Sequence, residues 1–270
     1  MVISMPELAD VEGFRRVLAR HAVGRRVLDV NVIDSGVLRG FTPDTLRDAL
    51  RGNSFAEPDR HGKLLISPIR ETGAHLLIHF GMTGALVWSD GDRQRHRHER
   101  VSIAVTTGEL RYRDMRKLKG LYLVPDRHEL ENQLAALGPD ACAISAQELR
   151  EAVCRRRRML KSALSDQRTI AGLGNLLVDE ILWQTELDPR DRGVDISGRE
   201  LERLHSTMRT VLCDAAAAGR VPARNSWLTG HRDVPSGQCP DGTDPWAGQQ
   251  SHDSVVSAVS AAVHAVTIGP

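Results

Sequence analysis

The stretch MLKSALSDQRTIAGLGNLLVDEILWQTE, residues 159–186, decides the fold of the second half of the chain. Apolar residues recur at helical spacing on both sides of a glycine-containing turn, which predicts two amphipathic helices. The turn, AGLGN at residues 171–175, has two glycines that permit positive φ and a close approach of the backbone. Its amides can form an anion-binding nest at the start of the second helix, where Asn175 could also donate to a phosphate. An ordinary helical hairpin is the more common structure and stays open as the alternative at this point.

The rest of the second half is also predicted to be helical. Ser145 and Glu148 have the spacing of a capping box, after which a basic helix begins. Ser197 and Glu200 repeat that spacing before a last helix, which ends in an alanine-rich segment and Gly219. The second half is therefore predicted to be an all-α domain.

The first half has the pattern of antiparallel β structure. A helix with one apolar face is predicted over residues 10–23, a strand over 26–33, and a short helix from Thr42–Pro43. Turns rich in glycine, aspartate and serine separate the apolar segments of strand length that follow, at residues 63–69, 74–80, 85–88, 101–106, 109–113 and 121–124. The predicted fold class is α+β, an N-terminal antiparallel β-sandwich flanked by helices and followed by the helical domain.

The composition is that of a globular protein. Of the 270 residues, 41% are hydrophobic and 26% are charged, which excludes wholesale disorder. No apolar run approaches the 18 residues or so of a membrane span, and the first residues lack the pattern of a secretory signal peptide. The four cysteines stand alone without a CxxC pair, so neither a disulfide framework nor a paired zinc site is predicted. A reducing cytoplasm fits these features.

Positive charge is concentrated locally, although the net charge is only +1. The three basic clusters are RQRHRHER at 93–100, RYRDMRKLK at 111–119 and RRRRMLK at 155–161. Three such clusters in a nearly neutral chain indicate one positive face on the folded protein. Solvated loops and helix faces are the alternative interpretation of each cluster taken alone.

The segment Met5-Pro6-Glu7 can supply an unusual nucleophile. If translation starts at Met5 and that methionine is removed, Pro6 becomes a secondary amine with a pKa of roughly 8. Such an amine can attack an aldehyde-level carbon and form a cationic iminium, while Glu7 transfers protons. Read without further context, Pro-Glu is simply the start of a helix.

Five segments, in this order, together resemble the formamidopyrimidine-DNA glycosylase / endonuclease VIII family. The opening PELADVE at 6–12 is similar to the family's PELPEVE. The other four are HGKLL at 61–65, HFGMTG at 79–84, DMRKL at 114–118 and the helix-two-turn-helix segment 165–182. The resemblance covers about residues 6–230, and as an ordered set it is highly specific.

The resemblance implies a DNA glycosylase/AP lyase that acts on double-stranded DNA with an oxidised base or an abasic site. An enzyme of this kind everts the damaged nucleotide and fills the gap that it leaves. The resemblance implies three catalytic residues: Pro6 as the nucleophile at C1′, Glu7 as general acid/base, and Lys63, which would hold a phosphate near the lesion and assist strand cleavage. It also implies two sets of DNA-binding residues. Met82, Arg116 and Leu118 would form the wedge, while Lys161, Gly174 and Asn175 would bind phosphates.

The sequence departs from the family pattern in several places. Ala9-Asp10 replaces Pro-Glu, and Leu118 stands where the family has an aromatic wedge residue. Four residues precede Met5, and if they are retained the nitrogen of Pro6 is an amide. The family's C-terminal zinc finger is reduced to Cys239-Pro240, and the aligned stretch 248–252 has no arginine, so no metal or other cofactor is predicted.

The domains are predicted as a catalytic β-sandwich at 6–125, a linker at 126–141, a helix-two-turn-helix domain at 142–224 and a degenerate zinc-finger region at 225–270. Back-translation of 253–260 with a shift of one base permits Thr-x-Trp-Cys-Pro-Arg-Cys, like the family's second zinc-finger strand. We therefore hypothesise a frameshifted zinc finger, which sequencing the gene would test, with a natural low-complexity tail as the alternative.

Other expectations complete the reading of the sequence. DNA is expected in a basic cleft between the two domains of a monomeric, cytoplasmic, nucleoid-associated protein. The short segment before Cys239 favours oxidised pyrimidines, ring-opened purines or abasic sites over 8-oxoguanine. Two other functions stay open: a non-catalytic protein that binds damaged or abasic DNA, and an RNA-binding helix-two-turn-helix protein.

Overall fold

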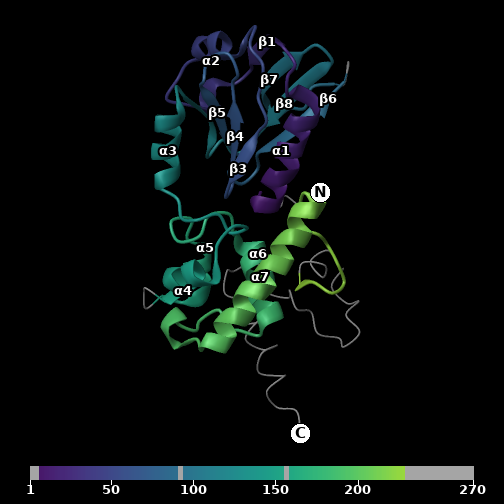
Figure 1. Ribbon diagram of the computed structural model, residues 1–270. Helices are drawn as coiled ribbons and strands as arrows, with labels where there is room; N and C mark the ends of the chain where they lie inside the picture. The colour runs from purple at the N-terminus through teal and green to yellow at the C-terminus, as the bar shows by residue number, and fades with distance from the viewer. Residues whose placement is uncertain (1–5, 91–93, 155–157, 229–270) are drawn as a thin grey trace. The chain divides into compact units, whose positions relative to one another are not determined.

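The computed structural model describes residues 6–90, 94–154 and 158–228. These residues form two compact units, the first ending at Leu137 and the second beginning at Gly138 (Figure 1). The predicted zinc-finger residues, including Cys239, 248–252 and 253–260, lie outside the described residues. In the described part of the chain, no helix has both the length and the apolar character needed to cross a membrane.

The first unit contains two β-sheets. One sheet has the order β1-β7-β8-β6 and the other the order β2-β9-β5-β4-β3. Every neighbouring pair is antiparallel except β2 and β9, which are parallel. The strands are β1 Val27–Val32, β2 Leu38–Arg39, β3 Asp59–His61, β4 Leu64–Pro68, β5 His75–His79, β6 Ala85–Ser89, β7 Glu99–Val105, β8 Gly108–Arg113 and β9 Gly120–Val124.

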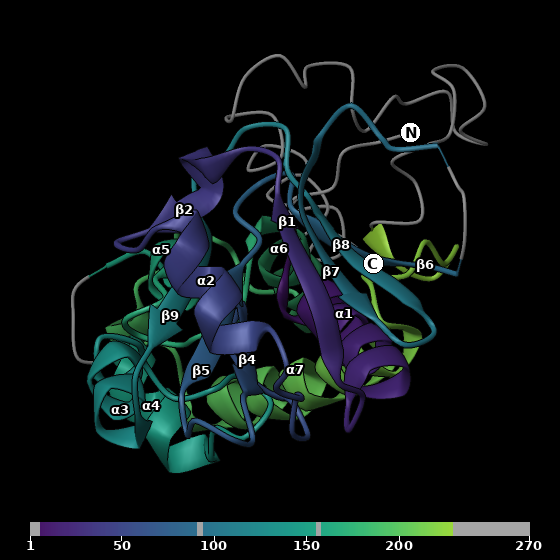
Figure 2. The ribbon, with the colours of Figure 1, turned by 90° about the horizontal axis from the view of Figure 1, so that it is seen from above.

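The core of this unit lies between the two sheets. Side chains alternate along each strand, so Leu110 and Tyr112 of β8 are buried in the same core as Leu76 and Ile78 of β5. The views in Figures 1 and 2 show the strands of the two sheets as separate layers. The structure therefore confirms the predicted sandwich, with the parallel β2–β9 pair as an exception to its antiparallel character.

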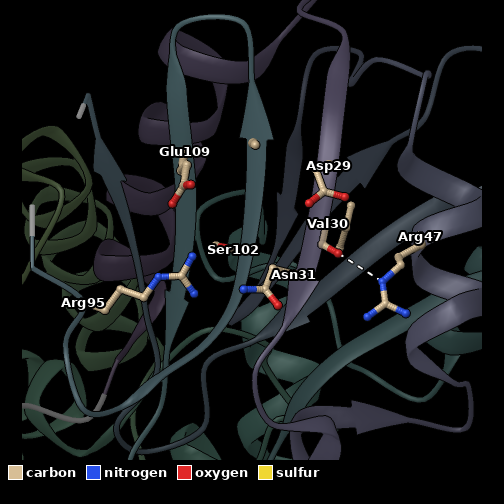
Figure 3. Close-up of a pocket in the computed structure, with 8 residues that line it drawn as sticks. Asp29, Val30, Asn31, Arg47, Arg95, Ser102 and Glu109 are labelled. Atoms are coloured by element: carbon tan, nitrogen blue, oxygen red, sulfur yellow. Dashed lines mark hydrogen bonds between the residues drawn. The ribbon is translucent and has the colours of Figure 1, made fainter. Parts of the chain in front are cut away.

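Two helices complete the sandwich. Helix α1, Leu8–Ala22, contacts β3 and β4 of one sheet and β6 and β8 of the other. Helix α2, Pro43–Leu50, begins after the N-cap Thr42 and packs beside the edge strand β1. Arg47 of α2 donates from Nε to the Val30 carbonyl at 3.2 Å (Figure 3), which satisfies a backbone acceptor on the free edge of that sheet.

The outer face of the β1-β7-β8 sheet carries a polar hollow of about 230 Å³. Asp29 and Asn31 of β1, Ser102 of β7 and Glu109 of β8 line it, with Arg95 at its side (Figure 3). The described residues that line this hollow include none of those predicted to take part in catalysis or DNA binding. The predicted chemistry therefore belongs to other parts of the molecule.

The segment 126–141, which the sequence predicts to be a linker, contains helix α3, Arg127–Ala135. The carboxylate of Asp126 caps this helix by accepting the amide of Glu129 at 2.9 Å. Leu130 and Leu134 pack against a small apolar cluster on the five-stranded sheet. The helix is hard to recognise in the sequence because these two leucines are its main apolar contacts with the sheet.

The second unit is helical, as predicted. Its α-helices are α4 Ala146–Cys154, α5 Leu160–Ser165, α6 Asn175–Thr185 and α7 Gly198–Ala218, with a short 3-10 helix, η2, at Gly193–Asp195. Both predicted capping boxes form, because Ser145 pairs with Glu148 and Ser197 with Glu200. Helix α6 packs along α7, which ends at Gly219 in the left-handed conformation.

Candidate catalytic residues and nucleic-acid interface

The N-terminus of α1 holds the first predicted catalytic residues. Glu7 is the N-cap of the helix and is fully buried. Its amide donates to Oδ2 of Asp10 at 2.9 Å, which closes a capping box. Asp10, the shortened acid of the opening motif, thus fixes the turn that carries Glu7. Pro6 immediately precedes this turn and is also buried.

Lys63 lies in the turn between β3 and β4, and α1 packs against both strands. Burial lowers the pKa of the Lys63 ammonium, and the negative charges of Glu7 and Asp10 oppose that shift. The opposing effect requires the lysine to lie within electrostatic reach of both carboxylates. Lys63 therefore lies within electrostatic reach of Glu7, although 56 positions in the sequence separate them.

His79, the last residue of β5, belongs to the same cluster and was not singled out in the sequence analysis. Burial, with smaller effects from Lys119 and Lys63, lowers the pKa of its imidazole to about 4. Its Nδ1 accepts the amide of Gly81 at 3.0 Å, so the neutral ring carries its proton on Nε2. The sequence feature that could have identified His79 is its position as the first residue of the HFGMTG segment.

The three predicted wedge residues stand on two loops of the first unit. Met82 lies in the turn between β5 and β6, while Arg116 and Leu118 lie in the loop between β8 and β9. The guanidinium of Arg116 contacts Met82 Sδ at 3.0 Å. Leu118 is 52% exposed. The structure thus places Met82 and Arg116 side by side and leaves Leu118 accessible to a ligand.

Two polar side chains connect these loops, and sequence reasoning did not identify either as functional. Thr83 donates from Oγ1 to Oδ1 of Asp114 at 2.5 Å. The amide of Arg116 donates to both oxygens, at 3.0 Å and 3.1 Å. Both residues lie inside motifs that the sequence analysis quoted, but only the folded chain shows that they pair.

The second unit holds the remaining predicted residues. Lys161 of α5 forms an ion pair with Asp179 of α6, with 2.7 Å between Nζ and Oδ1. The Lys161 ammonium is therefore already paired with a carboxylate, and a phosphate would have to share it with Asp179. Gly174 is the N-cap of α6 and Asn175 is its first residue. These residues lie at the positive end of the helix, where anions bind favourably.

The AGLGN turn differs in detail from the expectation. Gly172 has φ +117°, whereas Gly174 has φ −118°, so only the first glycine uses positive φ. The side chain of Gln167 holds the turn, because it accepts the Gly172 amide at 3.0 Å and donates to the Leu173 carbonyl at 2.7 Å. The Gly172 amide is thus engaged within the turn, and an anion would meet the amides closer to α6.

Metal binding has no support in the described part of the chain. Within residues 6–90, 94–154 and 158–228, no group of three or more His, Cys, Asp or Glu side chains is placed to hold a metal ion. After residue 225 the sequence has one cysteine, Cys239, in place of the paired cysteines of a zinc finger.

Two family models match this chain. The N-terminal domain of formamidopyrimidine-DNA glycosylase matches residues 5–121, and the H2TH domain of the same glycosylase matches residues 136–225. A formamidopyrimidine-DNA glycosylase of Desulfitobacterium hafniense is 33% identical over 224 residues, which cover 82% of each chain. That of Symbiobacterium thermophilum is 35% identical over 216 residues, which cover 78% of this chain and 70% of the relative.

Solved structures agree with these matches. Lactococcus lactis formamidopyrimidine-DNA glycosylase, bound non-covalently to DNA containing an AP site, aligns with a TM-score of 0.74 and 26% identity, covering 80% of this chain and 83% of that chain. The two domains, in this order, define a DNA glycosylase of the H2TH class. The chain belongs to the formamidopyrimidine-DNA glycosylase family.

Proposed function

We propose that this chain is a base-excision-repair DNA glycosylase and AP lyase, which removes an oxidised base from duplex DNA and cleaves the strand at the abasic site. One observation carries the proposal. Pro6 and Glu7 lie at the start of α1, and Lys63, from the turn between β3 and β4, lies within electrostatic reach of Glu7. The group combines a buried carboxylate, a cation and the residue that supplies the nucleophile. Membership of the glycosylase family supports the same reaction.

The proposed reaction begins with the free amine of Pro6. Its lone pair attacks C1′ of the damaged nucleoside, the bond from C1′ to the base breaks, and the base leaves with a proton that Glu7 helps to deliver. Opening of the sugar ring then gives an iminium between the proline nitrogen and C1′. Loss of a proton from C2′ and departure of the 3′ phosphate complete the β-elimination, and water releases the enzyme.

The proposed DNA contacts follow from the positions of the charged and apolar side chains. Lys63 holds a phosphate near the lesion, and His79 beside it adds a neutral N–H donor. The wedge of Met82, Arg116 and Leu118 fills the gap left by the everted nucleotide. In the second unit, Lys161, Gly174 and Asn175 bind the phosphate backbone. A cytoplasmic, nucleoid-associated location fits this action on DNA.

The proposal is tested with a shortened chain that starts at Met5 and is processed to Pro6. It is incubated with duplex DNA that contains one abasic site, in the presence and absence of borohydride. We expect strand cleavage without borohydride and a covalent protein–DNA complex with it, and peptide mapping should place the DNA on Pro6. Binding without either product would instead indicate a non-catalytic protein that recognises damaged DNA.

A further inference from the structure

We propose that the side chains of Thr83 and Asp114 form a latch that joins the two wedge loops into one rigid unit. Thr83 and Asp114 are then positioning residues for the eversion of the damaged nucleotide, although neither needs to touch the DNA. The inference rests on the proposed function, because it concerns how the wedge of that enzyme is held.

The first step of the argument is that the wedge is divided between two loops. Residues 81–84 connect β5 of one sheet to β6 of the other, while residues 114–119 connect β8, the neighbour of β6, to β9. The pairing of β6 with β8, in which Ala85 lies opposite Arg113, brings the ends of the two loops together, but the ladder stops there and leaves the loops themselves to other contacts. The hydrogen bond from Thr83 to Asp114 at 2.5 Å joins the loops directly, and the Arg116 amide donates to both side chains.

The second step is that Asp114 is buried and is fixed by several hydrogen bonds. It is 1% exposed, and its Oδ2 accepts the hydroxyl of Tyr112 at 3.2 Å. Burial, together with the nearby carboxylate, raises the pKa of Tyr112, so this hydroxyl stays protonated as a donor. The Asp114 carbonyl accepts Nε of Arg100 at 2.7 Å. Hydrogen bonds to a buried carboxylate are among the stronger ones in proteins.

The third step is that the far end of the second loop is braced as well. Arg39 of β2 donates to the carbonyls of Lys117 and Lys119, at 2.5 Å and 2.8 Å, which are the residues on either side of Leu118. Lys117 has φ +52°, a conformation that a side chain larger than glycine adopts only when its surroundings impose it. The backbone under both Arg116 and Leu118 is therefore fixed before DNA binds.

A fixed wedge has a physical purpose. Unstacking a base step costs a few kcal/mol, so the bases tend to restack and to expel the side chains inserted between them. Two loops that move independently would be displaced from the DNA stack. Ordering them on binding would also cost conformational entropy. The latch removes both losses, because the three wedge side chains move only together.

The test compares Thr83→Val, which keeps the size and branching but removes the hydroxyl, with Thr83→Ser, which keeps the hydroxyl. We expect Thr83→Val to lower kcat/KM on duplex abasic DNA by roughly ten- to a hundredfold, the loss expected for hydrogen bonds that involve a charged group. The ratio of duplex to single-stranded activity should fall, and Thr83→Ser should restore it. Thermal unfolding of each variant checks that the chain is folded.

A spectroscopic measurement reports on the wedge itself. A 2-aminopurine placed opposite the abasic site should report, through its fluorescence, how the wedge displaces the orphaned base. We expect a smaller change with Thr83→Val than with the unchanged chain, and an intermediate change with Asp114→Asn, which keeps the shape but loses the charge. Asp114→Asn also provides the second variant if Thr83→Val does not fold.

The outcomes separate this inference from the proposed function. Suppose that Arg116→Ala lowers the ratio of duplex to single-stranded activity, while Thr83→Val and Asp114→Asn leave this ratio unchanged. The wedge assignment is then supported and the latch is overturned. The same holds if Thr83→Ser fails as completely as Thr83→Val, because the hydroxyl is then not the group that matters. If Arg116→Ala itself leaves the ratio unchanged, the wedge assignment in the proposed function is wrong.

Discussion

At the scale of single residues, the proposed chemistry depends on charged groups that are buried together. Glu7 is fully buried, yet Asp10 and the first turn of α1 supply polar partners, and Lys63 supplies the opposite charge. Burial makes such charges interact more strongly than they would in water. The cluster is therefore suited to move a proton and to hold an anion at one place.

Removing the Lys63 ammonium should weaken DNA binding and slow strand cleavage. For Lys63→Ala we expect a loss of about 1.5–3 kcal/mol in binding, because one charge-assisted phosphate contact disappears. The slope of log affinity against log salt should fall by about one phosphate. Binding titrations at several salt concentrations measure both. The control is Arg127→Ala, which removes a cation from the exposed end of α3; an unchanged salt slope for Lys63→Ala would count against a place at the DNA.

Arg116→Ala should harm action on duplex DNA selectively. The side chain contacts Met82 and can occupy the space opposite an orphaned base, and that space exists only in a duplex. Cleavage rates on matched duplex and single-stranded abasic DNA measure the effect. An equal loss on both substrates would show that Arg116 is not part of a wedge.

His79 should make the stability of the first unit depend on pH. Its pKa is about 4 in the folded chain, below its ordinary value of 6.5. Between these values the unfolded chain binds more protons than the folded chain does. The free energy of unfolding therefore falls as the pH drops from about 6.5 to 4, and above pH 6.5 this destabilisation is absent. The contribution is at most about 3 kcal/mol. Denaturation at pH 7.5 and pH 5 should show a smaller loss for His79→Gln than for the unchanged chain, and equal losses would contradict the assignment.

At the scale of secondary-structure elements, the sequence predicts what local patterns determine. The helix after Pro6 and the strand over 26–33 are readable because apolar residues follow one period over several turns or pleats. Strands β2 and β3 have two and three residues, too few to show a period. The pairing of Thr83 with Asp114 could not be read from the sequence, because it depends on the pairing of β6 with β8, in which Ala85 lies opposite Arg113.

Gly120, at the start of β9, is a point where two elements meet closely. A Cβ at this position would lie 2.0 Å from the Val37 carbonyl oxygen, and the residue has φ +154°. Gly120→Ala should therefore destabilise the first unit by about 2–4 kcal/mol, measured by thermal or urea unfolding. Gly40→Ala is the matched control, since Gly40 has φ +82° with nothing within 4 Å of its Cβ position, and it should cost only about 1–2 kcal/mol. Equal effects would mean that the close approach to Val37 is unimportant.

At the scale of the whole molecule, the function was predictable because the motifs occur in the family's order over both units. The two family models together match most of the chain and end at residue 225, close to where the composition changes. The predicted site residues fall into two groups, one in each unit. Each group is assembled by its own fold, Lys63 with Glu7 in the first unit and Lys161 with Asp179 in the second.

The start of the chain decides whether the whole molecule can act as an enzyme. In the 270-residue sequence Pro6 follows Met5, so its nitrogen is in a peptide bond and its lone pair is delocalised into the carbonyl. An amide of this kind cannot form an iminium. The match to the family model begins at residue 5, the methionine that precedes Pro6.

We therefore expect a large difference between two forms of the protein. The chain that starts at Met5 and is processed to Pro6 should crosslink to abasic DNA under borohydride, whereas the 270-residue form should bind the same DNA without a crosslink at Pro6. Binding should persist because it depends on Lys63, Arg116 and Asn175, whereas the covalent route depends on one nitrogen atom. Gel analysis of the trapped complex, with the mass of the mature N-terminus measured on the same samples, decides the matter. If the long form also crosslinks while its Met1 end is intact, another amine is the nucleophile and the assignment of Pro6 is wrong.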